Sequence, residues 1–182
     1  MSRLENDHAK PAMADLIAGK SGIPIPQSRA YSIALFAFKT AVVVEYLSRG
    51  RTDRFFPRNV RHRFRQTLEI PPTVNMWMAG YLPRGQGRCW TSYHHLAKPN
   101  GLELYVCTFG AGHFVFQAVA EREVGSMALY PVSRLEELAV PFWPRVPDNF
   151  IWPAKVGLKS VKDFDLFASR WRRLETIRFF GD

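Results

Sequence analysis

The stretch from Ser28 to Ser48 is apolar around most of a helix, and no other feature of the sequence restricts the fold as strongly. At about 100° per residue, Ser28, Ser32, Lys39 and Tyr46 fall on one narrow stripe, and nearly everything else is apolar. A helix with so little polar surface belongs in the core of a globular domain, with the stripe near water. Lys39 and Glu45 also argue against a membrane-spanning helix, because charges within the hydrocarbon region are costly.

Helical patterns lie on both sides of this stretch. Ser2 to Glu5 has the spacing of a capping box, and Pro11 either opens a second helix or breaks the first. Residues 21–27 contain two prolines and are expected to be extended. A helix is predicted from Pro57 to Leu68, with apolar residues every fourth position facing inward.

After the Pro71-Pro72 pair the apolar period changes from helical to about two residues, which predicts strands. Turn sequences rich in glycine, proline and asparagine separate the apolar segments, so an antiparallel meander of about four strands is expected. The predicted strands are Val74–Tyr81, Cys89–His95, Leu102–Phe109 and His113–Glu121.

The last third of the chain is expected to cover this sheet. Pro131 to Pro153 reads as a loop rich in proline and tryptophan, with a short helical turn near Ser133 to Leu138. Lys159 to Leu174 is predicted to be a closing helix. With 182 residues, the chain fits a single α+β domain. Its expected parts are a helical arm and linker (1–27), a helical part (28–70), the sheet (73–121), a Pro/Trp-rich segment (122–158) and a closing helix with a tail (159–182).

The net charge of +9 is concentrated in one segment. Residues 49–65 contain seven arginines and a single acidic residue, Asp53, whereas residues 101–150 carry a net charge of −3. On the predicted 57–68 helix, Arg58, Arg61 and Arg65 lie within about 60° of each other. Guanidinium groups bind phosphates and carboxylates through paired hydrogen bonds, and they also stack on bases.

This arginine-rich segment is therefore the candidate binding surface for a polyanion. Phe55 and Phe56 interrupt it, as stacking on nucleic acid would require. The alternatives are a plain solvated helix face with both phenylalanines in the core, or a surface for an acidic protein. The candidate contact residues are Arg49, Arg51, Arg54, Phe55, Arg58, Arg61 and Arg65, with Arg170, Arg172 and Arg173 as a second contact.

Catalytic patterns are weak in this sequence. His95 or His113 with Cys107 or Cys89 are the candidates for a His/Cys site across the sheet, but metal-ligand spacings and phosphate-binding glycine loops are absent. A non-catalytic protein without metal or cofactor is expected. Two cysteines exclude a disulfide framework, and the polar, mixed-charge N-terminus does not fit a secretory signal, so a cytoplasmic location is expected.

Several short motifs follow one another along the chain in a recognisable order. They are Met1-Ser-Arg-Leu-Glu5, Ala9-Lys-Pro11, Phe38-Lys-Thr-Ala41, Phe55-Phe56, Pro71-Pro72, Val74 to Tyr81, Trp143-Pro144 and Trp152-Pro153. This order resembles the C-terminal module of a bacterial and phage family associated with HNH endonucleases. The resemblance implies that the nuclease part, with its metal-binding finger, lies before residue 1. No position in this chain matches its catalytic residues.

Together these observations predict a non-catalytic module that binds nucleic acid or a nucleoprotein complex, and not a membrane, through the arginine-rich segment. One alternative is a phage or mobile-element protein that inhibits or regulates a nucleoprotein complex by binding an acidic protein surface. The other is an enzyme with a His/Cys site on the sheet.

Overall fold

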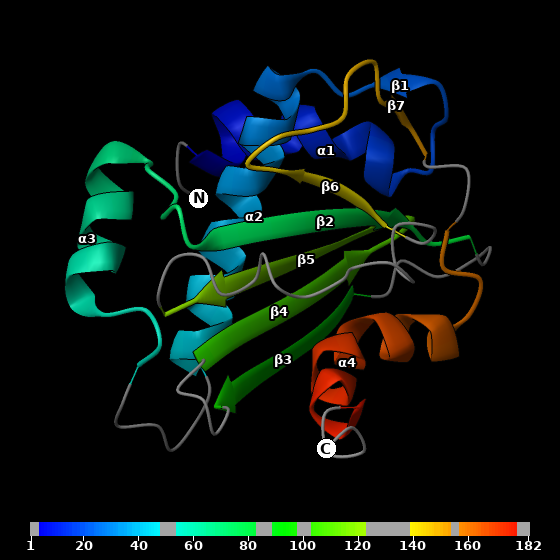
Figure 1. Ribbon diagram of the computed structural model, residues 1–182. Helices are drawn as coiled ribbons and strands as arrows, with labels where there is room; N and C mark the ends of the chain where they lie inside the picture. Colours follow the sequence, from blue (N-terminus) through cyan, green and yellow to red (C-terminus); the bar gives the residue numbers. More distant parts are fainter. Residues whose placement is uncertain are drawn as a thin grey trace.

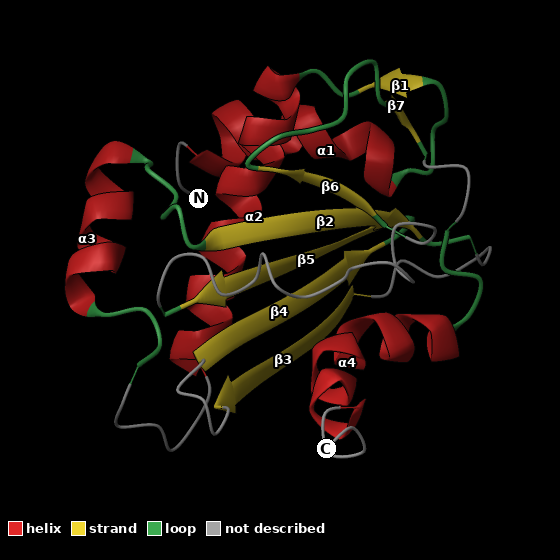
Figure 2. Cartoon of the chain, viewed as in Figure 1, coloured by secondary structure: helices red, strands yellow, loops and turns green. Residues whose placement is uncertain are grey.

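A five-stranded antiparallel sheet organises the chain in the computed structural model (Figures 1 and 2). The structure describes residues 4–47, 54–82, 89–97, 103–122, 139–153 and 157–177. Helices cover both faces of the sheet, which confirms the predicted α+β class. In spatial order the strands are β3 (Cys89–Ala97), β4 (Glu103–Ala111), β5 (Phe114–Glu121), β2 (Val74–Gly80) and β6 (Val140–Trp143).

The long helix predicted from the apolar stretch is α2 (Gln27–Leu47). Its inward side contains Ile33, Leu35 and Phe38, all without solvent exposure, and it contacts β4, β5 and β6. By length and composition alone, α2 could also cross a membrane. Before it, a π-helical segment, η1 (Leu4–Ala9), continues into α1 (Lys10–Ile17), where Pro11 occupies the first turn as Pro often does.

The order of the strands differs from a simple meander. β3, β4 and β5 follow one another, but β2 pairs with β5 rather than with β3, from Val74 opposite Ala120 to Gly80 opposite Phe114. Every residue of β5 is buried. A strand that is covered on both faces needs a hydrogen-bonded neighbouring strand at each of its two edges. For β5 the second of these neighbours is β2, which is also mostly buried.

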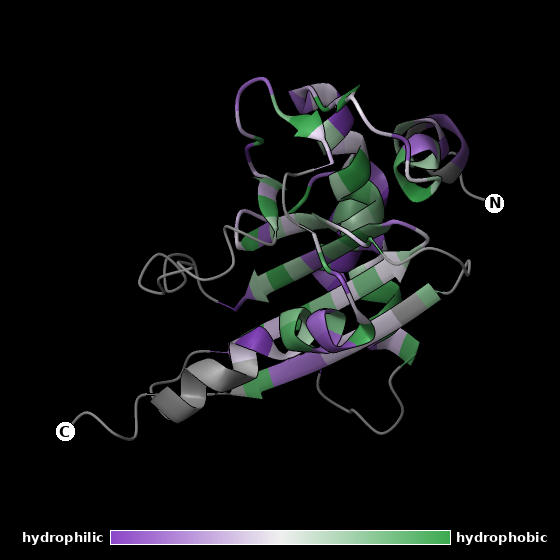
Figure 3. Cartoon of the chain, turned by 90° about the vertical axis from the view of Figure 1, so that its right-hand side faces the viewer, coloured by the Kyte–Doolittle hydropathy of each residue, from purple (hydrophilic) through white to green (hydrophobic). Residues whose placement is uncertain are grey.

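Successive residues of the strands point to two separate hydrophobic cores. Tyr105 and Phe116 face α2 and the N-terminal helices, whereas Val106 and Val119 face α4 (Val161–Ile177). The α4 helix is the predicted closing helix. Figure 3 shows hydrophobic residues, in green, both in the strands and in the helices beside the sheet.

The segment expected to be a Pro/Trp-rich loop contains two strands instead. β6 pairs with β2 at the edge of the sheet, and β7 (Ile151–Trp152) pairs with β1 (Ile23–Pro24), which lies in the predicted extended linker. Pro141 is tolerated within β6 because an edge strand leaves part of its backbone unpaired. The helical turn predicted at Ser133 to Leu138 lies outside the described residues.

Candidate nucleic-acid interface on helix α3

Helix α3 (Arg58–Thr67) carries most of the described arginine-rich segment, and its buried residue is Phe64. The Phe64 ring lies edge-on to the ring of Phe38 in α2, with 4.8 Å between centroids. Pro57, with its extended backbone, precedes the helix, and Leu68 ends it in the left-handed conformation. The Leu68 N–H donates to the carbonyl oxygen of Phe64 at 2.9 Å, which closes the last turn.

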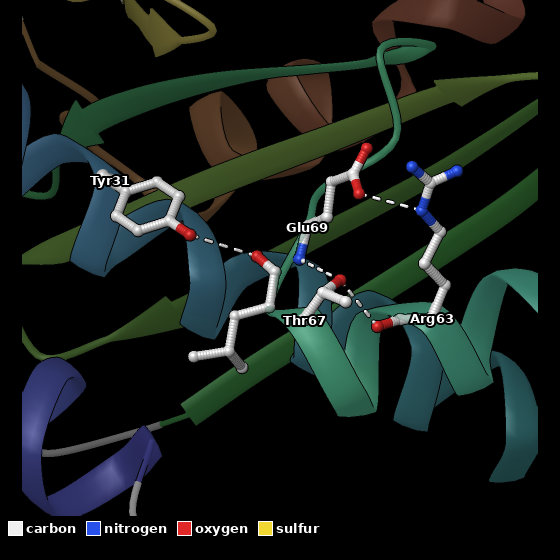
Figure 4. Close-up of polar contacts among 5 residues, drawn as sticks. Tyr31, Arg63, Thr67 and Glu69 are labelled. Carbon is white, nitrogen blue, oxygen red and sulfur yellow. Dashed lines mark hydrogen bonds and ion pairs between the residues drawn. The ribbon is translucent and has the colours of Figure 1, made fainter.

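The C-terminal end of α3 is attached to the start of α2 (Figure 4). The Tyr31 hydroxyl donates to the carbonyl oxygen of Leu68 at 3.1 Å. Beside it, the Thr67 hydroxyl donates to the carbonyl oxygen of Arg63, and the Arg63 side chain forms an ion pair with Glu69 at 2.8 Å. Considering only the described residues, Arg63 is therefore the arginine of α3 whose charge an acidic side chain balances.

The N-terminal end of α3 is attached to the end of α2. The Glu45 carboxylate is buried and accepts hydrogen bonds from the main-chain N–H groups of Phe55 and Phe56. The Arg54 side chain donates from Nη1 to the main-chain oxygen of Glu45 at 2.8 Å. Both ends of α3 are thus held by hydrogen bonds to α2, which fixes the helix on the scaffold.

The outward surface of α3 is basic. Arg58, His62 and Arg65 are exposed, Arg61 is half-buried, and α3 itself contains no acidic residue. Among the described residues, no acidic side chain forms an ion pair with any of these four. We call Arg58, Arg61, His62 and Arg65 the basic face. Arg58, Asn59 and His62 line a shallow depression at the N-terminal end of α3.

The structure corrects the role expected for Phe55. Its ring is 4% exposed and packs against the rings of Phe56, Tyr105 and His95, with the Arg122 guanidinium 5.1 Å from its centroid. A ring enclosed in this way has no free face for a base. Phe55 and Phe56 are therefore core residues that anchor the start of α3, which was the alternative interpretation.

Arg170 is also placed differently from the expectation of a second surface contact. It is 6% exposed, and its guanidinium carbon lies 4.6 to 5.3 Å from the ring centroids of Trp77, Phe167 and Trp171. Its side-chain nitrogens have no hydrogen-bond partner among the described residues. Desolvation lowers the pKa of Arg170 to about 9. Arg49 and Arg51, and the side chains of Arg172 and Arg173, lie outside the described part of the chain.

The two histidines of the candidate His/Cys site lie far apart, although the register places His95, opposite Tyr105, on the same face of the sheet as Cys107, opposite Tyr93. His95 lies 3.5 Å from the Glu103 carboxylate and pairs with Tyr105, whereas His113 lies at the far end of β4, about 20 Å away along the strand. The His113 Nδ1 is hydrogen-bonded to the carbonyl oxygen of Tyr81 at 2.7 Å. Burial raises the pKa of the Cys107 thiol to about 12, so it remains protonated and is a poor nucleophile.

The ring of His113 has a packing role instead. A Cβ atom on Gly19, which adopts a positive φ of 75°, would lie 2.6 Å from this ring. The main-chain N–H of His113 donates to the carbonyl oxygen of Ile17. His113 thus joins the sheet to the end of α1. Within the described ranges, no group of His, Cys, Asp and Glu side chains is arranged to hold a metal ion.

Sequence reasoning did not single out Tyr46 as a functional residue. Its side chain is 64% exposed at the end of α2, and the Arg54 guanidinium carbon lies 5.2 Å from its ring centroid. The signal was present, because Tyr46 falls on the predicted polar stripe and directly precedes the arginine-rich segment.

Comparison of the chain with protein-family models, curated proteins and solved structures finds no match.

Proposed function

We propose that this chain is a non-catalytic module that binds nucleic acid, free or within a nucleoprotein complex, through the basic face of α3. The observation that carries the proposal is the charge of Arg58, Arg61 and Arg65, which no acidic side chain among the described residues balances, on a helix fixed at both ends. From Arg58 to Arg65 the helix extends about 10 Å. One strand of DNA carries about three phosphates over that length.

The chemistry of the basic face supports phosphate binding. A guanidinium group keeps its charge at any physiological pH and offers planar, paired N–H donors to a phosphate. Contacts of this kind release counterions from the nucleic acid, so affinity falls steeply as salt is added. Because phosphates are the same in every sequence, we expect binding that is largely independent of sequence.

The resemblance to the HNH-associated family gives this proposal a context, namely a module that acts beside a separately encoded nuclease. The alternative ligand is an acidic protein surface, to which the same guanidinium groups would bind carboxylates. A phage or mobile-element protein that regulates a nucleoprotein complex would use the basic face in that way.

The test is the affinity of labelled single- and double-stranded DNA and RNA, measured by fluorescence anisotropy over a range of salt concentrations. In the variant R58Q/R61Q/R65Q we expect roughly 10- to 100-fold weaker binding and a log–log salt slope that is smaller by about 2 to 3. R63Q is the matched control, because Arg63 lies on the same helix but is paired with Glu69.

The control variant R63Q should retain the affinity and the salt slope of the wild type. Two results would overturn the proposal. The first is that the wild type binds none of the four oligonucleotides at low salt. The second is that R58Q/R61Q/R65Q and R63Q weaken binding equally.

A further inference from the structure

The most exposed aromatic ring in the described part of the chain lies at one end of the basic face. Tyr46 is 64% exposed, whereas the aromatic side chains around it, such as Phe38, Phe55 and Phe56, are buried. Tyr46 therefore presents an accessible aromatic ring beside a cluster of cations. Such a ring can stack on a flat, unsaturated ligand.

The ring of Tyr46 is held in place together with a cation. The Arg54 guanidinium lies 5.2 Å from the ring centroid, within the range of a cation–π interaction. Arg54 is itself oriented by its hydrogen bond to the main-chain oxygen of Glu45. The Glu45 side chain anchors the next two residues of the chain in the core. Tyr46 and Arg54 therefore form a preorganised pair of an aromatic ring and a positive charge.

Three contacts establish that α2 and α3 run antiparallel. Tyr31 contacts Leu68, Phe38 contacts Phe64, and Glu45 contacts Phe55. Residue numbers therefore increase along α2 in the direction in which they decrease along the segment that contains α3. The end of α2 consequently lies beside the start of α3. Figure 1 shows that α2 and α3 run in opposite directions. Because Tyr46 lies in the last turn of α2 and Arg58 begins α3, Tyr46 is at the Arg58 end of the basic face.

The helical rotation places Tyr46 and the arginines on the same side of this helix pair. Tyr46 lies about 80° around α2 from Phe38, and Arg61, Arg65 and Arg58 lie about 60° to 120° around α3 from Phe64. Because the helices are antiparallel and face each other through the two phenylalanines, both rotations lead to one side. Arg63 is rotated in the opposite sense and pairs with Glu69.

We propose that the ligand of the basic face is single-stranded nucleic acid, with one base stacked on Tyr46 and the adjoining phosphates on Arg54, Arg58, Arg61 and Arg65. The inference rests on the proposed function and names its substrate class. In a duplex the bases are stacked on each other and cannot cover an exposed ring. A single strand offers both a free base and a line of phosphates, and a π face accepts any base.

The experiment compares Y46A, Y46F and L47A by fluorescence anisotropy. Leu47 is the matched control, since it is the neighbouring residue, 71% exposed and not aromatic. The ligands are a labelled oligothymidylate, an oligouridylate, an abasic strand of the same length and a long duplex, in which nearly all bases are stacked on each other. Circular dichroism checks that each variant is folded. Comparison of the affinities for the oligothymidylate and the oligouridylate shows whether the protein prefers single-stranded DNA or RNA.

For Y46A we expect roughly 5- to 100-fold weaker binding to the base-containing single strands, with the salt slope unchanged. Binding to the duplex and to the abasic strand should change less than about twofold, because neither presents a base to the ring. Y46F should bind as the wild type does, since it retains the ring, and L47A should do the same.

The two proposals fail in different ways. If R58Q/R61Q/R65Q loses affinity while Y46A binds every ligand as the wild type does, the basic face is retained and the stacking of a base on Tyr46 is refuted. Tighter binding of the wild type to the duplex than to single strands would also refute it. Equal affinities of the wild type and R58Q/R61Q/R65Q would refute the proposed function itself.

Discussion

The carboxylate of Glu45 accepts a hydrogen bond from the main-chain N–H of Phe55, ten residues further along the chain. The second carboxylate oxygen accepts from the N–H of Phe56. Glu45 is 1% exposed, so these bonds form in the core, where the N–H groups have no access to water. One buried acidic side chain thus joins the end of α2 to the residues that begin the arginine-bearing helix.

We predict that E45A lowers the free energy of unfolding by about 2 to 4 kcal/mol, because two buried N–H groups lose their acceptor. E45Q should be intermediate, since its amide keeps one carbonyl oxygen. Urea unfolding followed by tryptophan fluorescence measures the effect. E69A, which removes an exposed carboxylate, is the control and should lower the free energy of unfolding by less than about 1 kcal/mol. Equal stability of E45A and E69A would contradict the anchoring role of Glu45.

The helices were predictable from the sequence because their signals are local. The pattern from Ser28 to Ser48 is apolar over so much of its circumference that only a core helix fits, and the observed α2 differs from it by one residue at each end. Strand order was not predictable in this way. The pairing of β2 with β5 depends on which strand is covered on both faces, and no turn sequence between β2 and β3 reveals it.

The strand β6 shows a second limit of local patterns. Val140 to Trp143 contains a proline and is followed by another, a composition typical of loops. It becomes a strand because β2 has a free edge, and because a strand at the edge of a sheet tolerates Pro141. The decisive factor is therefore the unpaired edge of a strand some sixty residues earlier in the chain.

The basic face was predictable and the surroundings of individual residues were not. Helical spacing alone places Arg58, Arg61 and Arg65 close together, and the structure keeps them near solvent. Phe55 and Arg170 differ, because their exposure is decided by what packs over them. Tyr105 and His95 cover the ring of Phe55, and two tryptophans cover the guanidinium of Arg170. Apart from Trp171, which directly follows Arg170, these neighbours are distant in sequence.

We predict that R170M raises the free energy of unfolding by about 1 to 3 kcal/mol. The Arg170 guanidinium remains charged at neutral pH, because its pKa is lowered only to about 9. Its burial without a hydrogen-bond partner among the described residues therefore carries a desolvation cost, which the aromatic rings offset in part. Methionine keeps an unbranched apolar chain and removes the charge.

Urea unfolding of R170M, R170K and the wild type at pH 7 tests this prediction. R170K should be the least stable, since it keeps the charge and loses the planar group that stacks on the tryptophans. If R170M is instead less stable than the wild type, the cation–π contacts of Arg170 stabilise the fold by more than the desolvation of its guanidinium destabilises it. Nucleic-acid affinity of R170M should match that of the wild type, because Arg170 lies away from the basic face.

The last prediction concerns Glu103, whose pKa is lowered chiefly by its hydrogen bond from Arg122 at 2.6 Å, with a contribution from His95. A carboxyl group whose pKa is lower in the folded state stabilises the fold above its unfolded pKa, near 4.5. That contribution is lost as the pH falls through the folded-state value. We therefore expect E103Q to lower the free energy of unfolding at pH 7 by about 0.5 kcal/mol, the size typical of a solvent-screened pair.

The difference between E103Q and the wild type should stay near its pH 7 value as long as the pH is well above 4.5, and should shrink as the pH is lowered below 4.5 through the folded-state pKa, because both proteins then carry an uncharged side chain at this position. Urea unfolding at closely spaced pH values measures it. E69Q serves as the control, because the Arg63–Glu69 pair is more exposed and should contribute less. A difference for E103Q that stays constant as the pH falls well below 4.5 would show that Glu103 acts through packing, and that its ion pair with Arg122 contributes nothing to stability.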